Sequence, residues 1–321
     1  MQPNCSGKRS NGGRASGRVG QVTVGGERHH KVTSMSVVLS ERADIGRENQ
    51  IRPQAPAVRP FSLGAGIGRA ARSIGQIALF MVFGLYGTMM SALVVPAFSV
   101  VVRDRARRAR GIRRIMYCIT RTYVGSMRAM RLIDLEVSGL ERVPPPGSLI
   151  VANHPSLIDA LILLGQVEDG IVVAKRSLQV NPFTWGGIRG ADYVVNADPQ
   201  ALIEECRGRI ASGETLVLFP ECTRTANDGV IRLRRGAAHI AVRSRCTVLP
   251  VTIEFSEPLL TKKSRWWLAP KVRPSVRVVG HAAIDPAQFL QGDCSVSLAA
   301  RRLTEHLREL YVRELARRGS A

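Results

Sequence analysis

The chain has 321 residues, a formal net charge of +21 and a pI near 11, and 45% of its residues are hydrophobic. This length and composition exclude a wholly disordered or collagen-like chain and leave room for a sizeable core. The surplus of positive charge predicts an anionic partner, and the candidate classes are nucleic acid, acidic lipid and a phosphorylated substrate.

The distribution of charge divides the chain into three regions. Residues 1–72 carry a net charge of +8 and are rich in Gly, Ser, Arg and Pro, which predicts a disordered basic region. Residues 73–131 comprise an uncharged stretch, as far as residue 102, and then ten arginines with one aspartate. Residues 132–321 carry only +4 and are expected to form the folded body. Because a DNA-binding domain would carry its charge on the folded surface, we expect no nucleic-acid partner.

The uncharged stretch at residues 77–102 predicts a membrane-embedded helix, because 18 or more apolar residues suffice to cross a bilayer. Pro96 also allows a monotopic hairpin, and a third interpretation is a buried helix of a soluble core. The arginines that follow are expected at the anionic cytoplasmic leaflet, which would place the body in the cytoplasm, at the inner membrane. These arginines are Arg103, Arg105, Arg107, Arg108, Arg110, Arg113 and Arg114.

The six cysteines are scattered along the chain without any CxxC or paired spacing. This pattern predicts neither a disulfide framework nor a zinc site, and it agrees with a reducing compartment.

From about residue 133, short β-rich runs alternate with helical segments. This alternation predicts an α/β fold with a mixed, largely parallel sheet flanked by helices, preceded by the helical membrane anchor. Strands are expected at residues 135–137, 148–152, 171–174, 193–195, 215–219, 247–255 and 275–279. Helices are expected at residues 157–164, from 199 to the Ser212-Gly213 pair, at 236–244 and at about 296–317.

The strand at 148–152 runs directly into Asn153-His154-Pro-Ser-Leu-Ile-Asp159. Reactive groups collect at the carboxyl ends of strands in α/β sheets, where His154 is placed. Asp159 can accept from one imidazole nitrogen and leave the other as a general base. Ser156-x-x-Asp159 also matches a helix capping box, in which Asp159 would only satisfy backbone amides.

A second polar loop, Pro220-Glu221-Cys222-Thr223-Arg224-Thr225, follows the strand at 215–219. The planar guanidinium of Arg224 is suited to holding a phosphate. Glu221 is expected to orient Arg224 or to accept from a substrate hydroxyl, and the alternative is a surface salt bridge between the two.

Together, these loops resemble the NHxxxxD and FPEGTR boxes of the glycerolipid (lysophospholipid) acyltransferase family, of the 1-acylglycerol-3-phosphate acyltransferase type. Gly190-Ala-Asp-Tyr-Val-Val-Asn196 and Val248-Leu-Pro-Val-Thr-Ile253 are similar to two further boxes of that family, in the correct order. The resemblance covers roughly residues 130–260. It implies that residues 132–321 form an acyltransferase domain in which His154, oriented by Asp159, deprotonates an acceptor hydroxyl.

The resemblance also implies the substrates. The activated oxygen would attack the thioester of acyl-CoA or acyl-carrier protein, with no cofactor and no metal. Glu221, Thr223 and Arg224 would hold the phosphate of a lysophospholipid acceptor at a membrane of anionic lipids. Asn153, Asn196 and Lys175 complete the expected substrate-binding set.

Two positions depart from the family pattern. Cys222 stands where the family has Gly, and a left-handed backbone would be strained for Cys. Asn196 stands where the family has an acceptor-binding Arg, which weakens the case for a glycerol-phosphate acceptor. Lys175, Arg189 and the cluster at residues 232–235 are candidate substitutes, unless they are solvated or face a carrier protein. The alternatives are therefore the same chemistry on an ornithine-type, hydroxylated or aryl-polyene-type lipid, or a non-catalytic membrane-anchored basic binding protein.

The pair Trp266-Trp267 lies among basic residues and predicts one of two structures. It is either an interfacial patch that rests on lipid headgroups or an exposed loop anchored by two partly buried indoles. The flanking basic residues are Lys262, Lys263, Arg265 and Lys271.

Overall fold

The computed structural model describes residues 63–140, 145–196, 198–225, 230–291 and 294–317. Most of the region predicted to be disordered, residues 1–62, lies outside these ranges. The remaining ten residues of that region, 63–72, are helical, so the predicted boundary at residue 72 is too late. The helix extends to this point because Arg69 and Arg72 bond to backbone carbonyls nearly 200 residues away, a contact that local sequence does not reveal.

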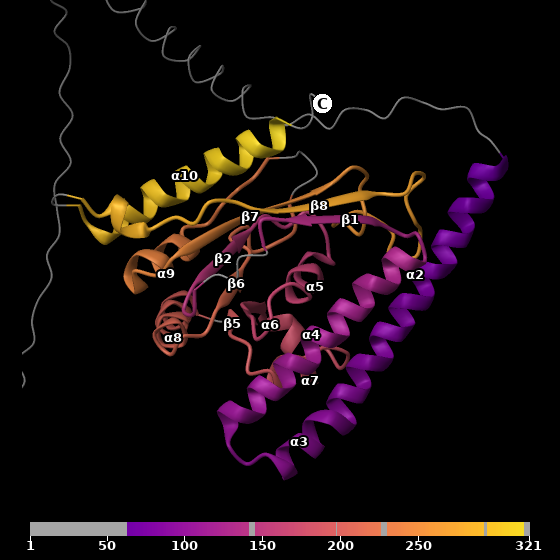
Figure 1. Ribbon diagram of the computed structural model, residues 1–321, viewed down its shortest axis with the longest axis horizontal. Coiled ribbons are helices and arrows are strands. Elements are labelled where there is room, and N and C mark those ends of the chain that lie inside the picture. The colour runs from indigo at the N-terminus through magenta and orange to yellow at the C-terminus, as the bar shows by residue number, and fades with distance from the viewer. Residues whose placement is uncertain (1–62, 141–144, 197, 226–229, 292–293, 318–321) are drawn as a thin grey trace, which may run out of the picture. The chain divides into compact units, whose positions relative to one another are not determined.

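The apolar stretch forms one long helical rod that then doubles back. The rod consists of α2 (Leu63–Met89), the π-helical turn η1 (Met90–Val94) and α3 (Val95–Val101). The π-turn ends two residues before Pro96, and its wider turn accommodates a proline that lacks the N–H of a continuous helix. Helix α4 (Arg105–Ala129) then runs back along α2, and the rings of Phe83 and Tyr123 meet at 5.6 Å (Figure 1).

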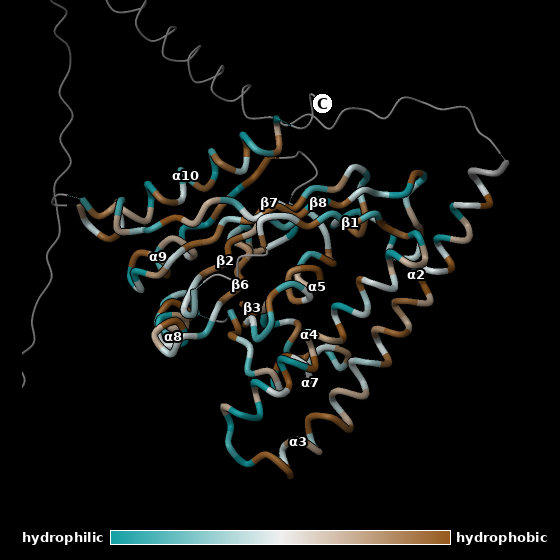
Figure 2. Tube along the Cα trace, viewed as in Figure 1, coloured by the Kyte–Doolittle hydropathy of each residue, from teal (hydrophilic) through white to brown (hydrophobic). Residues whose placement is uncertain are grey.

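Residues 66–101 are long and apolar enough to cross a membrane, judged by length and composition alone. Only 11% of the most apolar window is buried, which disfavours the interpretation as a soluble core helix. Figure 2 shows the hydrophobic colour along α2 and α3 and the hydrophilic colour at the turn before α4.

One arginine of α4 does not face lipid as predicted. Arg113 is buried, and its guanidinium lies 2.5 Å from Asp169 Oδ1 and 3.1 Å from Glu214 Oε1. Both carboxylates belong to the folded body, so Arg113 joins α4 to it. A helix packed along a protein buries one of its sides, and Arg113 lies on that side of α4, where the two carboxylates compensate its charge. The other six arginines of residues 103–114 are exposed or half-buried.

The body is built on a six-stranded sheet in the order β1-β8-β7-β2-β6-β3. Neighbouring strands are parallel except for β7 and β8, which confirms the predicted mixed, largely parallel sheet. The strands are β1 (Asp134–Ser138), β2 (Leu149–Ala152), β3 (Ile171–Val172), β6 (Leu216–Leu218), β7 (Val248–Phe255) and β8 (Ser275–Gly280).

Two predicted strands are displaced. The run at 171–174 is divided between β3 and β4 (Ala174–Lys175), because the chain changes its partner there. Val173 N still bonds to Val217 O beside β3, whereas Ala174 pairs with β5. Instead of a strand at 193–195, the structure has β5 (Val195–Asn196), which pairs with β4 in a separate two-stranded ribbon.

The helices of the body agree with the expected ones at four places. These are α5 (Asp159–Leu164), α8 (Pro199–Ala211), α9 (Gly236–Ser244) and α10 (Val296–Ala316). The sequence did not indicate α6 (Arg176–Gln179), α7 (Trp185–Gly190) or the 3-10 turn η2 (Pro286–Phe289). Figure 1 shows α10 over one side of the sheet and α5 with α4 on the other.

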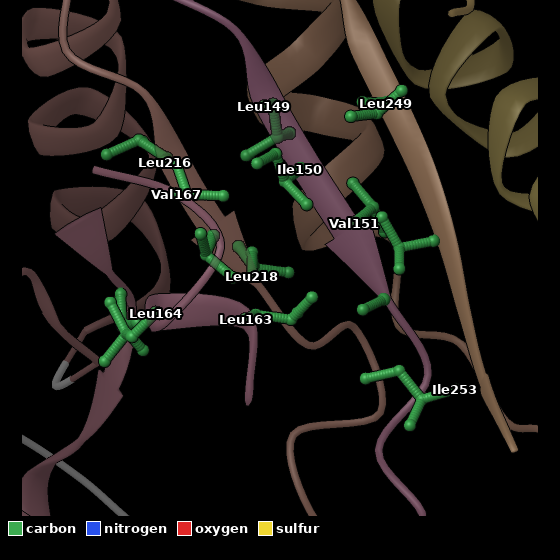
Figure 3. Packing of buried hydrophobic residues seen from close by; sticks show 14 of the residues in the cluster. Leu149, Ile150, Val151, Leu163, Leu164, Val167, Leu216, Leu218, Leu249 and Ile253 are labelled. Carbon is green, nitrogen blue, oxygen red and sulfur yellow. The ribbon is translucent and has the colours of Figure 1, made fainter. Parts of the chain in front are cut away.

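The core surrounds the central strand β2, all four residues of which are buried. Figure 3 shows Leu149, Ile150 and Val151 between the side chains of Leu216 and Leu218 and that of Leu249. A parallel strand covered on both faces needs apolar residues throughout, which explains the uninterrupted Leu-Ile-Val-Ala run. The polar residues of the next segment therefore begin where this dry core ends.

Candidate active site

The end of β2 is tied to its neighbour β7 by Asn153. The buried amide of Asn153 donates to Ile253 O at 2.8 Å and accepts from Ile253 N at 2.7 Å. These two bonds imitate one more step of the sheet and fix the direction in which the chain leaves it. Asn153 was expected to bind substrate, but this geometry supports a positioning role.

His154 and Asp159 are in direct contact. Nδ1 of His154 lies 2.9 Å from Oδ2 of Asp159, and the same oxygen accepts from Ser156 N at 2.7 Å. Asp159 therefore contacts the imidazole and also satisfies a backbone amide, so it is not confined to the capping role of the second interpretation. With Nδ1 engaged, Nε2 is the nitrogen left for a substrate, and the His154 side chain is 20% exposed.

The pair is electrostatically unusual because Asp159 is completely buried. Burial raises the pKa of Asp159 to about 6, against the lowering effect of its hydrogen bonds to His154 and Ser156 and of the nearby charge of Arg224. Its second oxygen, Oδ1, has no hydrogen-bond partner within the described ranges. The carboxylate is thus ionised at neutral pH at the expense of stability, a condition typical of functional sites.

The second loop is bonded directly to the first. Glu221 Oε1 accepts from His154 N at 2.9 Å and from Thr225 Oγ1 at 2.8 Å, while Thr225 N donates to His154 O at 2.7 Å. The imidazole also stacks on Phe219, with ring centroids 4.4 Å apart. Glu221 is buried, and that burial raises its pKa. Within the described residues it forms no ion pair with Arg224, so the alternative of a Glu221–Arg224 salt bridge is not observed. Glu221 instead holds the backbone of the histidine, and its contact with a substrate hydroxyl stays a prediction.

Arg224, on the same loop, lies near enough for its charge to oppose the rise that burial causes in the pKa of Asp159. Its Nη1 donates to Leu260 O at 2.8 Å and to Thr261 O at 2.9 Å, and the residue is half-buried. Thr223, one residue earlier, is exposed. The structure therefore places a guanidinium close to the His154–Asp159 pair and anchors it by two carbonyls rather than by a carboxylate.

Cys222 has a left-handed backbone with φ of 56°. The loop thus adopts the conformation for which glycine is suited, although the residue is Cys. Its side chain is exposed, and desolvation raises the pKa of its thiol, which keeps the sulfur protonated. These properties do not favour a nucleophile.

Lys175 and Asn196 lie side by side, because they are register partners in the β4–β5 ribbon. Both side chains are exposed. The ribbon begins just past the carboxyl end of β3, at the same edge of the sheet as the ends of β2 and β6. The structure brings these two predicted residues together, and their contact with an acceptor stays a prediction.

Two adjoining cavities, of about 410 and 440 Å³, lie beside α7 rather than at His154. Both are lined by Arg189 and Gln179, and the Arg189 guanidinium lies 5.4 Å from the centre of the Trp185 ring. Arg105 and Arg108 of α4 line the first cavity. Arg189, a candidate substitute for the missing family arginine, therefore belongs to a basic cavity next to the helical rod.

One supporting residue was not anticipated. The hydroxyl of Tyr311, on α10, donates to Val151 O at 2.7 Å from a fully buried position. This bond braces β2 three residues before His154. A separation of 160 residues leaves no sequence signal for such a contact.

The chain is similar to known acyltransferases. Residues 134–254 match the model of the Acyltransferase family. The 1-acyl-sn-glycerol-3-phosphate acyltransferase alpha of Mus musculus is 29% identical over 160 residues, 46% of this chain and 54% of that protein. The 1-acyl-sn-glycerol-3-phosphate acyltransferase of Saccharomyces cerevisiae is 26% identical over 153 residues, 44% and 50% of the two chains. The chain therefore spans about half the length of these curated relatives.

A solved structure has the same fold. The crystal structure of the 1-acyl-sn-glycerophosphate (LPA) acyltransferase PlsC from Thermotoga maritima matches 80% of this chain and 98% of its own, with a TM-score of 0.61 and 24% identity. These matches confirm the resemblance to the glycerolipid acyltransferases and the predicted fold.

Proposed function

We propose that this chain is a membrane-associated O-acyltransferase that transfers a fatty acyl group from acyl-CoA or acyl-carrier protein to the hydroxyl of 1-acylglycerol-3-phosphate. The product would be phosphatidic acid, for phospholipid synthesis. The observation that carries this proposal is the contact of 2.9 Å between His154 Nδ1 and a buried Asp159, within the segment that matches the Acyltransferase family. The names of the relatives support the choice of acceptor.

In the proposed mechanism, Nε2 of His154 removes the proton from the acceptor hydroxyl. The oxygen forms a bond to the thioester carbonyl carbon, the carbon–sulfur bond breaks, and the proton passes from the imidazolium to the leaving thiolate. Asp159 holds the ring in the required tautomer and stabilises the positive charge that forms on it. Glu221 holds the backbone of His154, so that the ring remains stacked on Phe219.

Arg224 is the proposed partner of the acceptor phosphate. A guanidinium presents several donors in one plane, so two carbonyls on Nη1 still leave donors for phosphate oxygens. Thr223, exposed on the same loop, adds a hydroxyl donor. Lys175 and Asn196, paired on their ribbon, would extend the site toward the acceptor.

We further propose that the protein is seated on one face of an anionic membrane, with the body in the cytoplasm. The helical rod contacts the body from Arg69, near its start, to Ser91, which bonds to Gly186 N at 3.0 Å. The opposite side of the rod is an exposed apolar stripe with helical spacing. A helix docked along its length in this way favours lying in the membrane surface over crossing it. The stripe consists of Ile67, Ile74, Met81, Leu85, Met89, Leu93 and Val100.

The test of function is a transfer assay with purified protein on vesicles. Lysophosphatidic acid and labelled acyl-CoA or acyl-carrier protein are supplied, and the product is identified by mass. Replacing His154 by alanine should lower the transfer rate by at least about a hundredfold, the contribution of a general base, and leave vesicle binding unchanged. His306→Ala, on the exposed side of α10, is the matched control.

Each other result points to a different function. Full transfer activity in His154→Ala would overturn the mechanism. Failure to make phosphatidic acid, with His154-dependent transfer to an ornithine-type, hydroxylated or aryl-polyene-type acceptor, would favour the specialised reaction that Asn196 suggests. Loss of vesicle binding on replacing the exposed arginines of α4, without any transfer activity in the unchanged chain, would favour a non-catalytic binding protein.

A further inference from the structure

The loop between β7 and β8, residues 256–274, exposes large apolar side chains. Trp266 and Trp267 are each 46% exposed, Leu268 is 39% exposed and Val272 is 54% exposed. Basic residues surround them on the same loop, and those at positions 262, 263, 265 and 271 are all exposed. Indole rings beside lysine and arginine are typical of segments that rest at the boundary between water and lipid.

This loop is held firmly against the apolar rod. The Ser73 hydroxyl accepts from Ala269 N at 3.0 Å, Arg69 donates to Ala269 O at 2.9 Å, and the amide of Gln76 donates to Trp266 O. The ring of Trp266 packs on that of Phe80, with centroids 5.4 Å apart. The tryptophans therefore lie beside α2 by fixed contacts, and their exposure does not result from a loose loop.

The same loop also reaches the candidate active site. The carbonyls of Leu260 and Thr261 hold Arg224, and Leu259 O accepts from the buried Ser156 hydroxyl at 2.8 Å. Only four residues lie between Thr261 and Trp266. Because the tryptophans and these carbonyls belong to one loop, the depth of the tryptophans in a membrane would also set the position of Arg224 relative to that membrane.

We propose that the β7–β8 loop is a second membrane contact, in which Trp267 and Leu268 enter the interfacial region of an anionic bilayer beside α2. Burying these side chains in the interface removes apolar surface from water, and the neighbouring ammonium and guanidinium groups meet the phosphates of lipid headgroups. The occupant is lipid rather than a protein because the exposed indole rings lie among four exposed basic side chains, which suits an anionic headgroup region, and because the loop is bonded to α2, whose opposite side is the apolar stripe. The contact sets the depth at which Arg224 meets an acceptor phosphate.

This proposal rests on the attachment of the helical rod to the membrane surface proposed above, called the membrane seat below. Fluorescence distinguishes the loop contact from that attachment. The chain contains three tryptophans, so replacing Trp185 and Trp266 by phenylalanine leaves Trp267 as the only indole. The full chain is mixed with vesicles of phosphatidylcholine and phosphatidylglycerol that carry bromine at defined depths on the acyl chains. Trp267 emission should shift to the blue and be quenched most by bromine near the headgroup end.

A second measurement uses the unlabelled vesicles and compares two single substitutions. Trp267→Ser should weaken partition to the vesicles on the order of tenfold, since it removes one large apolar contact. Leu298→Ser alters a similarly exposed apolar residue, 40% exposed on α10, and should leave partition unchanged. Leu298 belongs to α10, a helix that lies apart from α2 in Figure 1, so this substitution is the matched control.

The outcomes distinguish the two proposals. Vesicle binding with Trp267 still fully accessible to an aqueous quencher would overturn the loop contact and leave the membrane seat standing. Equal partition of Trp267→Ser and Leu298→Ser would also overturn it. Absence of vesicle binding by the unchanged chain would overturn both the loop contact and the membrane seat.

Discussion

Replacing Asp159 by asparagine keeps the shape of the side chain but removes a charge from the dry interior of the site. Burial raises the pKa of Asp159 from 3.8 to about 6. Each pKa unit corresponds to about 1.4 kcal/mol, so the ionised carboxylate destabilises the folded state on the order of 3 kcal/mol. The orphaned Oδ1 is the structural source of this penalty.

The sign of the pH dependence follows from the direction of the shift. The pKa of Asp159 in the folded state exceeds its unfolded value, so the neutral carboxyl is the form that favours folding. The folded state therefore has its full stability below about pH 4 and loses part of it as the pH rises through 6. Asparagine does not titrate. The Asp159→Asn protein should therefore match the original near pH 4 and exceed it by up to about 3 kcal/mol above pH 7.

The assay is denaturant unfolding in detergent micelles between pH 4 and pH 8, with transfer activity measured on the same samples. Activity of Asp159→Asn should fall at least about a hundredfold, because the imidazole loses its orienting charge. In the original protein, activity should fall below pH 6 as Asp159 takes up a proton. Exposed Glu309→Gln, the control, should change stability by less than about 0.5 kcal/mol. A variant that is less stable than the original at pH 8, or a stability difference that does not vary with pH, would show that the buried carboxylate does not destabilise the fold.

Three further substitutions test the supporting structure by denaturant unfolding. Cys222→Gly should raise the free energy of unfolding by roughly 0.5–1 kcal/mol because it relieves the left-handed backbone, and destabilisation would argue against that strain. Arg113→Ala should lower it by about 3 kcal/mol, because Asp169 loses its partner, Ala191 O loses a donor and Glu214 keeps only Arg209, whereas the exposed Arg114→Ala should lower it by less than about 1 kcal/mol; equal losses would contradict the buried role. Tyr311→Phe should cost about 1–2 kcal/mol by leaving Val151 O with one bond fewer, and should reduce kcat with little change in KM; an unaltered kcat would show that this brace does not reach the histidine.

Most of the helices and strands could be predicted from the sequence, because each depends on a pattern of residues within its own segment. Three elements could each be predicted from a short stretch of neighbouring residues. These are the buried strand at 149–152, the helix that begins at the Asp198 cap with Pro199, and the helix α10 with its apolar face. The short helices α6 and α7 carried no such signal, since α7 contains three glycines and is held in place by contacts with the rod, such as that between Ser91 and Gly186.

The His154–Asp159 contact was also recognisable from the sequence, because the two residues lie five positions apart and can meet without help from a distant segment. Local patterns of residues were therefore enough to predict the layered α/β fold, the two polar loops at strand ends and the apolar stretch before them. Three features become visible only in the folded chain: Glu221 holds a histidine backbone instead of Arg224, Arg113 is buried in the body, and the tryptophan loop is bonded to α2. Each of these depends on partners between 56 and 196 residues distant in the chain, and no local pattern specifies which partner a side chain will find.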